Sequence, residues 1–168
     1  LDDEDKVSLV VYDTAIEVLL ETMPVRLART LMPMRLAEVR ANGGTALHAG
    51  WLKGAETLAP TAGSGMMSRV ILLSDGQANH GIINTQQICD QVRELASAGV
   101  TTSTVGIGMD FNEELMTAIA NAGQGNSWYG ERVQDLAESF DAEMGFLSSL
   151  AFQDVRVKLE TPLLPRMS

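Results

Sequence analysis

The sequence predicts an α/β fold with three layers: a mainly parallel sheet with one antiparallel edge strand, covered by helices on both faces. Short apolar runs typical of buried strands alternate with segments of helical apolar spacing. The runs at residues 70–73 and 100–107 are almost continuously apolar or β-branched, as central parallel strands are. The chain has 168 residues, 45% of them hydrophobic, which is enough for one domain with its own core.

The first elements indicate a hairpin. Residues 7–12 form a β-branched, apolar strand, residues 13–15 a turn, and residues 16–20 a second apolar strand. Residues 21–34 contain two prolines and are predicted to be loop with at most a short helix. A helical turn around Leu36 and Val39 should end at Asn42-Gly43-Gly44.

Three helices follow from spacing and capping signals. Thr45 is placed as the N-cap of the first, Asn84 caps the second, and Asp110 with Glu113 resembles a capping box for the third. Gly99 should close the second helix. The apolar residues that give these helices one buried face are Leu47, Trp51, Ala55, Leu58, Ile88, Val92, Leu95, Leu115, Met116 and Ile119.

The last part of the chain predicts a short strand at Trp128-Tyr129 and a long amphipathic helix from Val133 to Leu147. Residues 155–160 then alternate apolar and charged side chains, which is typical of a half-exposed strand. We therefore expect one domain over residues 1–150. Residues 151–168 should be a β segment that leads to a following domain or a linker.

Composition excludes several classes of protein. Lys and Arg total 12 against 22 Asp and Glu, so the net charge of −10 disfavours binding to nucleic acid. No apolar run reaches the roughly 20 residues that a membrane-spanning helix requires. Cys89 is the single cysteine, which excludes a disulfide framework and a multi-thiolate metal site. Secreted, cell-surface and cytoplasmic locations all stay open.

Three loops should meet at the carboxyl edge of the sheet, where open α/β folds bind ligands. Thr45 and Asp75 would supply a hydroxyl and a carboxylate, the hard oxygen donors that suit Mg²⁺, Mn²⁺ or Ca²⁺. The alternative is that Thr45 only caps a helix and Asp75 only forms a turn. The other residues predicted to form the ligand-binding loops are Gly43, Gly44, Gly76, Gln77, Asn79, Gly108 and Asp110.

Three motifs in order resemble the von Willebrand factor type A family, in its bacterial branch. They are Asn42-Gly43-Gly44-Thr45, the segment 69–79 (RVILLSDGQAN), and the segment 101–116 (TTSTVGIGMDFNEELM). The likeness covers about residues 5 to 150. It implies a Rossmann-like fold and a non-enzymatic, metal-dependent module for adhesion, interaction or assembly, whose partner is a protein.

The same resemblance implies that Thr45 and Asp75 belong to a metal site built from three loops. The family's first loop carries Asp-x-Ser-x-Ser after a central first strand, and this sequence contains neither. We therefore expect a divalent cation such as Mg²⁺ in the intact parent and weak binding, or none, by this chain. A sheet that lacks a central strand is also expected to recruit another strand, by self-association of chains, by direct closure, or by insertion of residues 154–160.

An enzyme is the alternative: a hydrolase or dehydrogenase fragment of Rossmann-like fold. Gly106-Ile107-Gly108 lacks the third glycine of a dinucleotide fingerprint, and Ser74 does not lie in a Gly-x-Ser-x-Gly elbow. His48 and His80 are interpreted as surface or helix-face residues. No catalytic residue is assigned.

Overall fold

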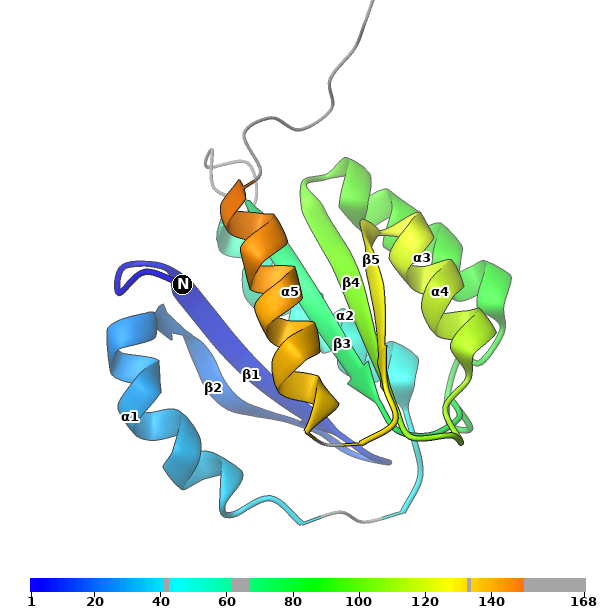
Figure 1. The fold of residues 1–168 in the computed structure, drawn as a ribbon. Coiled ribbons are helices and arrows are strands. Elements are labelled where there is room, and N and C mark those ends of the chain that lie inside the picture. The colour runs from blue at the N-terminus through cyan, green and yellow to red at the C-terminus, as the bar shows by residue number, and fades with distance from the viewer. Residues whose placement is uncertain (41–42, 62–66, 133, 150–168) are drawn as a thin grey trace, which may run out of the picture.

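The computed structural model describes residues 1–40, 43–61, 67–132 and 134–149, and the fold is drawn in Figure 1. The predicted strand at residues 155–160 and the C-terminal segment 151–168 lie outside this range. Two sheets carry the fold, with helices on both faces of the larger sheet. The α/β class is therefore confirmed.

The N-terminal hairpin is confirmed. Strand β1 (Lys6–Tyr12) pairs antiparallel with β2 (Ile16–Pro24), from Lys6 opposite Pro24 to Tyr12 opposite Ile16. The second strand is longer than the sequence predicts, because its pairing continues to the proline.

The three-stranded sheet is entirely parallel. Strand β3 (Ser68–Ser74) pairs with β4 (Val100–Ile107), and β4 pairs with β5 (Gln124–Gly130). The predicted strand at Trp128-Tyr129 lies within β5. All three strands end at one edge of the sheet, which is where the candidate site loops begin.

The sequence predicts residues 7–12, 70–73 and 100–107 as parallel strands of one sheet, but β1 is not hydrogen-bonded into that sheet within the described residues. Strand β1 is bonded to β2 in a separate two-stranded sheet, and β3 is bonded to β4. A side chain joins the two sheets instead, since the Tyr12 hydroxyl donates to the Leu73 carbonyl at 2.5 Å. Direct closure of β1 onto β3 has therefore not occurred. Within the described residues, β1 is paired only with β2, and β3 is paired only with β4.

Helix α2 (Leu47–Leu58) packs against β1, β2 and β3, and so it bridges both sheets. Helices α3 (Thr85–Ser97) and α4 (Glu113–Ala122) cover β4 and β5 beside it. The main core lies under these three helices and includes Trp51, which is 1% exposed. Its indole donates to Thr102 Oγ1 at 3.0 Å, so even positions of β4 face this layer.

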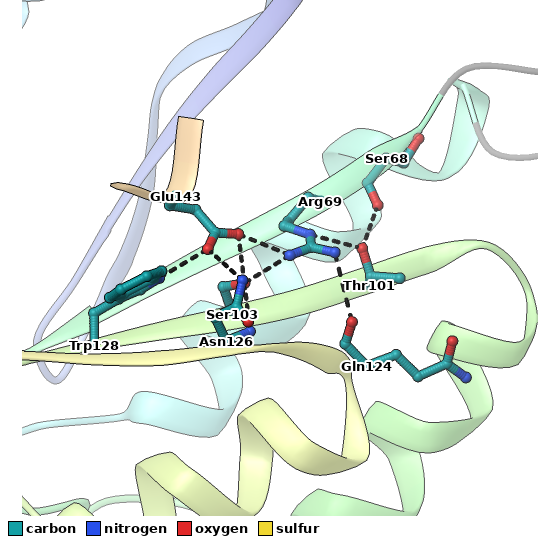
Figure 2. A network of polar contacts seen from close by, with 8 residues as sticks. All are labelled: Ser68, Arg69, Thr101, Ser103, Gln124, Asn126, Trp128 and Glu143. Carbon is teal, nitrogen blue, oxygen red and sulfur yellow. Dashed lines mark hydrogen bonds and ion pairs between the residues drawn. The ribbon is translucent and has the colours of Figure 1, made fainter. Parts of the chain in front are cut away.

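The opposite face of the sheet is covered by helix α5 (Asp135–Ser149), which packs against β5 and β4 and lies in front of the sheet in Figure 1. A buried ion pair holds it there: Arg69 Nη1 lies 2.7 Å from Glu143 Oε1, and the Glu143 side chain is 0% exposed. Figure 2 shows Ser103, Asn126 and Trp128 converging on the same carboxylate. Burial alone would raise the pKa of Glu143, but hydrogen bonds from Ser103, Asn126, Trp128 and Arg69 outweigh it and lower that pKa.

Arg69 is also held along its length. Its Nε donates to Thr101 Oγ1 at 3.0 Å and its Nη1 donates to Ser103 Oγ at 2.9 Å. The network therefore links β3, β4, β5 and α5 through charge-assisted hydrogen bonds.

One predicted loop is a helix. Residues 25–36 form α1 (Val25–Leu36), although Pro24 precedes it and Pro33 lies inside it. The first N–H groups of α1 are satisfied by distant backbone, since Val25 donates to the Asp5 carbonyl and Arg26 to the Asp3 carbonyl. No local side-chain cap exists to be recognised in the sequence.

Capping signals predict the structure correctly in one case of three. Asn84 caps α3 through its side chain, as expected, and Gly99 follows that helix at φ +94°. Asn112, rather than Asp110, caps α4 by accepting from Leu115 N–H. Thr45 does not cap α2: Ala46 holds that position without a side-chain hydrogen bond.

Candidate functional site

Thr45 is bound to the loop after β3 through its backbone. Its N–H donates to Asn79 Oδ1 at 2.8 Å, and its carbonyl accepts from Asn79 N–H at 3.2 Å and from His80 N–H at 3.4 Å. These bonds fix Thr45 ahead of α2 without using its hydroxyl. The interpretation of Thr45 as only a helix cap is therefore wrong.

The Thr45 side chain faces the turn that follows β3. A Cβ added at Gly76 would lie 3.6 Å from Thr45 Oγ1, so the hydroxyl is in contact range of the residue next to Asp75. Ser74 Oγ donates to the Gly76 carbonyl at 3.1 Å and fixes the shape of this turn. The structure thus brings Thr45, the Asp75-Gly76 turn and Asn79 together, with Asp75 itself exposed.

Gly43 and Gly44 connect the same edge to the hairpin turn. Gly44 N–H donates to Thr14 Oγ1 at 3.0 Å, and the His80 ring lies against Gly44 so closely that a side chain there would collide with it. Gly43 has φ +97°, a conformation that favours glycine. His80 is exposed, as expected, but it belongs to the site's surroundings.

Tyr12 is the residue that sequence reasoning missed. Its ring packs over Gly50, where any Cβ would collide with it, and its hydroxyl reaches β3 at Leu73. Burial, together with the negative charge of Asp75, raises the pKa of Tyr12 to about 12, although a hydrogen bond with Ser74 acts in the opposite direction. The tyrosine thus lies beside the candidate site; its place at a strand end before Asp13 is the one signal the sequence offers.

We expect the free energy of unfolding to fall at alkaline pH, because the buried Tyr12 hydroxyl resists ionisation in the folded state. The folded state keeps this proton when an unfolded tyrosine, with pKa 10.0, loses it. The stabilisation is complete below pH 10 and is lost as the pH rises to about 12, by about 2–3 kcal/mol. Urea unfolding at a series of pH values should show this loss in the native chain and a smaller loss in Tyr12→Phe. Equal losses in the two would contradict the assignment.

The third predicted loop lies further along the edge. Gly108, at φ +77°, donates its N–H to the Gly130 carbonyl at 2.9 Å, which ties the loop of Gly108 and Asp110 to the end of β5. Asp110 and Gln77 are exposed. Since β4 lies between β3 and β5, this loop begins one strand away from the turn after β3.

The donors present fit a divalent cation in kind but not in number. Thr45 and Asp75 offer a hydroxyl and a carboxylate, which are suitable oxygens for Mg²⁺. Within the described ranges, no group of three or more His, Cys, Asp and Glu side chains could hold a metal ion. Two protein oxygens would leave such an ion mostly hydrated.

The other chemistry-bearing residues have structural partners. His48 is buried on α2, where its Nε2 lies 2.8 Å from Gln91 Oε1 and its ring packs against Trp51. Of the two expected positions, surface or helix face, His48 takes the helix face and is buried there. Cys89 is buried, and burial raises the pKa of its thiol, so it is a poor nucleophile.

A parallel sheet with helices on both faces defines a Rossmann-like α/β domain, a class in which ligands typically bind at the carboxyl edge of the sheet. The chain belongs to the von Willebrand factor type A domain family, whose model matches residues 1–142. Domains of this family typically mediate protein interactions and metal-dependent binding. The resemblance noted in the sequence is confirmed.

Two curated relatives are uncharacterized proteins. The chain is 30% identical to YfbK of Escherichia coli over 125 residues, covering 74% of this chain and 21% of that protein. It is 26% identical to sll0103 of Synechocystis over 161 residues, covering 95% of this chain and 37% of the relative. The chain therefore spans less than two fifths of either relative.

Solved structures show the same fold. The BatB protein of Bacteroides thetaiotaomicron matches with a TM-score of 0.70 at 17% identity, over 89% of this chain and 82% of that chain. A von Willebrand factor type A protein of Catenulispora acidiphila matches with 0.70 at 23% identity, over 84% and 33%. Proximal thread matrix protein 1 from the mussel byssus, whose MIDAS motif is occupied by zinc, matches with 0.66 at 17% identity, over 85% and 36%.

Proposed function

We propose that the chain is a non-enzymatic protein-binding module whose ligand docks at the carboxyl edge of the sheet. In the intact parent, a divalent cation at Thr45 and Asp75 would contribute to that binding, as the resemblance implies. The observation that supports this is the position of the Thr45 hydroxyl, which does not cap helix α2 and lies against the Asp75-Gly76 turn. The zinc-occupied MIDAS motif of the mussel protein supports a divalent cation in a domain of this fold.

The enzyme alternative is less well supported. Phe111 packs on Gly106, where an added Cβ would collide with its ring, so this glycine has a packing role that requires no cofactor. The Ser74 hydroxyl donates to the Gly76 carbonyl, which is a structural role. Among the described residues, we find no histidine or carboxylate hydrogen-bonded to that hydroxyl as a general base.

We expect this chain to bind Mg²⁺ weakly, with a dissociation constant in the millimolar range or above. The reason is that Thr45 and Asp75 supply few of the oxygens that a dedicated cation site uses. Isothermal titration calorimetry with MgCl₂ measures the affinity directly. Micromolar affinity would show that the residues present suffice, and the expectation would be wrong.

The position of the site can be tested with a paramagnetic ion even when affinity is low. Millimolar Mn²⁺ should broaden the backbone NMR signals of Thr45 and Gly76 first. Asp75→Ala should abolish this selectivity, whereas Asp141→Ala, at an exposed carboxylate on α5, should preserve it. Broadening that follows other acidic residues equally would contradict the proposed site.

A further inference from the structure

A second surface lies at the same edge, at the ends of β4 and β5. It consists of Met109, Phe111 and Tyr129, which we call the Met109–Tyr129 surface. Met109 is 89% exposed and Tyr129 is 51% exposed. Exposed apolar side chains that lie together, rather than singly, are typical of interaction sites.

This surface is rigidly built. The Phe111 and Tyr129 rings stack with centroids 5.4 Å apart and an interplanar angle of 28°. Phe111 is seated on Gly106, where a Cβ would collide with its ring. The bond from Gly108 N–H to the Gly130 carbonyl fixes the loop that carries Met109 beside β5. A preorganised aromatic face loses little entropy on binding.

Carboxylates surround the tyrosine. Desolvation and the nearby charges of Glu131, Glu113 and Asp135 raise the pKa of Tyr129, which places these groups within electrostatic range of its hydroxyl. Arg132 is paired with Asp135 at 3.4 Å, whereas Glu131 and Glu113 form no ion pair within the described part of the chain. The negative charge around the ring is therefore incompletely compensated.

We propose that the Met109–Tyr129 surface docks a basic segment of a partner protein through an arginine side chain stacked on Tyr129. A guanidinium combines a flat face, which stacks on an aromatic ring, with donors that pair with carboxylates. Exposed methionine adapts to the apolar stem of the same side chain. The negative charge disfavours nucleic acid and anionic lipid as occupants.

This inference goes beyond the proposed function because it needs no metal. The surface follows β4 and β5, whereas Thr45 contacts the turn after β3. Strands lie about 4.8 Å apart, so the two regions are neighbours that a single partner could span. An arginine anchor would add specificity to the protein-binding edge independently of the cation.

The test is NMR titration of the chain, in EDTA, with a blocked Ala-Arg-Leu-Arg-Ala peptide. The Met109 methyl and Tyr129 ring signals should shift, with a dissociation constant in the high micromolar to millimolar range. The same peptide with citrulline in place of arginine should bind about tenfold more weakly, since it keeps shape but loses charge. Equal binding of both peptides, or shifts confined to other regions, would overturn the proposal.

Variants separate this surface from the metal site. Tyr129→Ala and Glu131→Gln should each weaken peptide binding several-fold, and Glu138→Gln, at an exposed position of α5, should not. Asp75→Ala should leave peptide binding unchanged. Loss of binding in Asp75→Ala, or a requirement for Mg²⁺, would assign the peptide to the metal site and overturn the inference.

Discussion

Glu143→Ala should lower the free energy of unfolding by about 3–5 kcal/mol, because it leaves Arg69 charged in a buried setting without its partner. Ser103, Asn126 and Trp128 would lose the same acceptor. A loss of this size is a large fraction of the stability of an ordinary domain, about 5–15 kcal/mol. Urea denaturation followed by circular dichroism measures it.

Two variants show whether the effect comes from the buried charge. Glu138→Ala removes an exposed carboxylate from the same helix and should change stability by less than about 0.5 kcal/mol. The double variant Arg69→Met with Glu143→Leu should cost less than the two single changes together, because no unpaired charge remains. A Glu143→Ala loss below about 1 kcal/mol would show that α5 does not depend on this ion pair.

The second large effect is on oligomeric state: we expect the chain to associate with itself at micromolar concentrations. Strand β3 is apolar and is paired only with β4 in the described structure, and β1 is paired only with β2. A strand edge of this kind recruits another strand, because its backbone groups would otherwise be left to water. Sedimentation velocity over a dilution series should show species larger than the monomer.

A charge at the edge should reduce this association. Ile71→Lys introduces a cation at a half-buried position of β3, and Leu31→Lys introduces one at an exposed apolar position of α1 as the control. The first should shift the equilibrium toward monomer, and the second should not. A native chain that stays monomeric with a cooperative thermal transition would refute obligatory association. Unchanged association in Ile71→Lys would exclude β3 as the contact.

The strands were predictable because their signals are local. Apolar runs at residues 70–73 and 100–107 specify buried strands wherever the neighbours lie, and Asn84 satisfies helix α3 with its own side chain. The order of strands and helices then leaves few topologies. Residue patterns alone therefore suffice to derive both the parallel sheet and the family resemblance.

The errors arose where distant parts of the chain determine the local structure. Helix α1 begins after a proline because Asp3 and Asp5 carbonyls, about twenty residues earlier, accept its first N–H groups. Thr45 sits in a capping sequence context, yet Asn79 engages its backbone. The separation of β1 from β3 into two sheets was also not predictable from either strand alone, because strand pairing depends on the neighbouring strands.

The nearness of Thr45 to the Asp75-Gly76 turn was predictable, whereas the residues around the two were not. Thr45 and Asp75 follow from strand polarity and the family motifs, and Asn79 proves to join their loops. Tyr12 could not be found, because its role depends on a ring crossing from one sheet to the other over Gly50.

Helix α2 connects the two sheets, which share no strand pairing in the described structure. Thr45 precedes its first turn, and Thr57 near its far end bonds to Ser8 at 2.7 Å and accepts from Thr22 at 2.7 Å. One end of the helix therefore lies at the carboxyl edge of the parallel sheet, and the other end is bonded to the hairpin. A force that a ligand applies to the Thr45 loop would be transmitted through α2 to the hairpin. Both sheets would therefore resist that force.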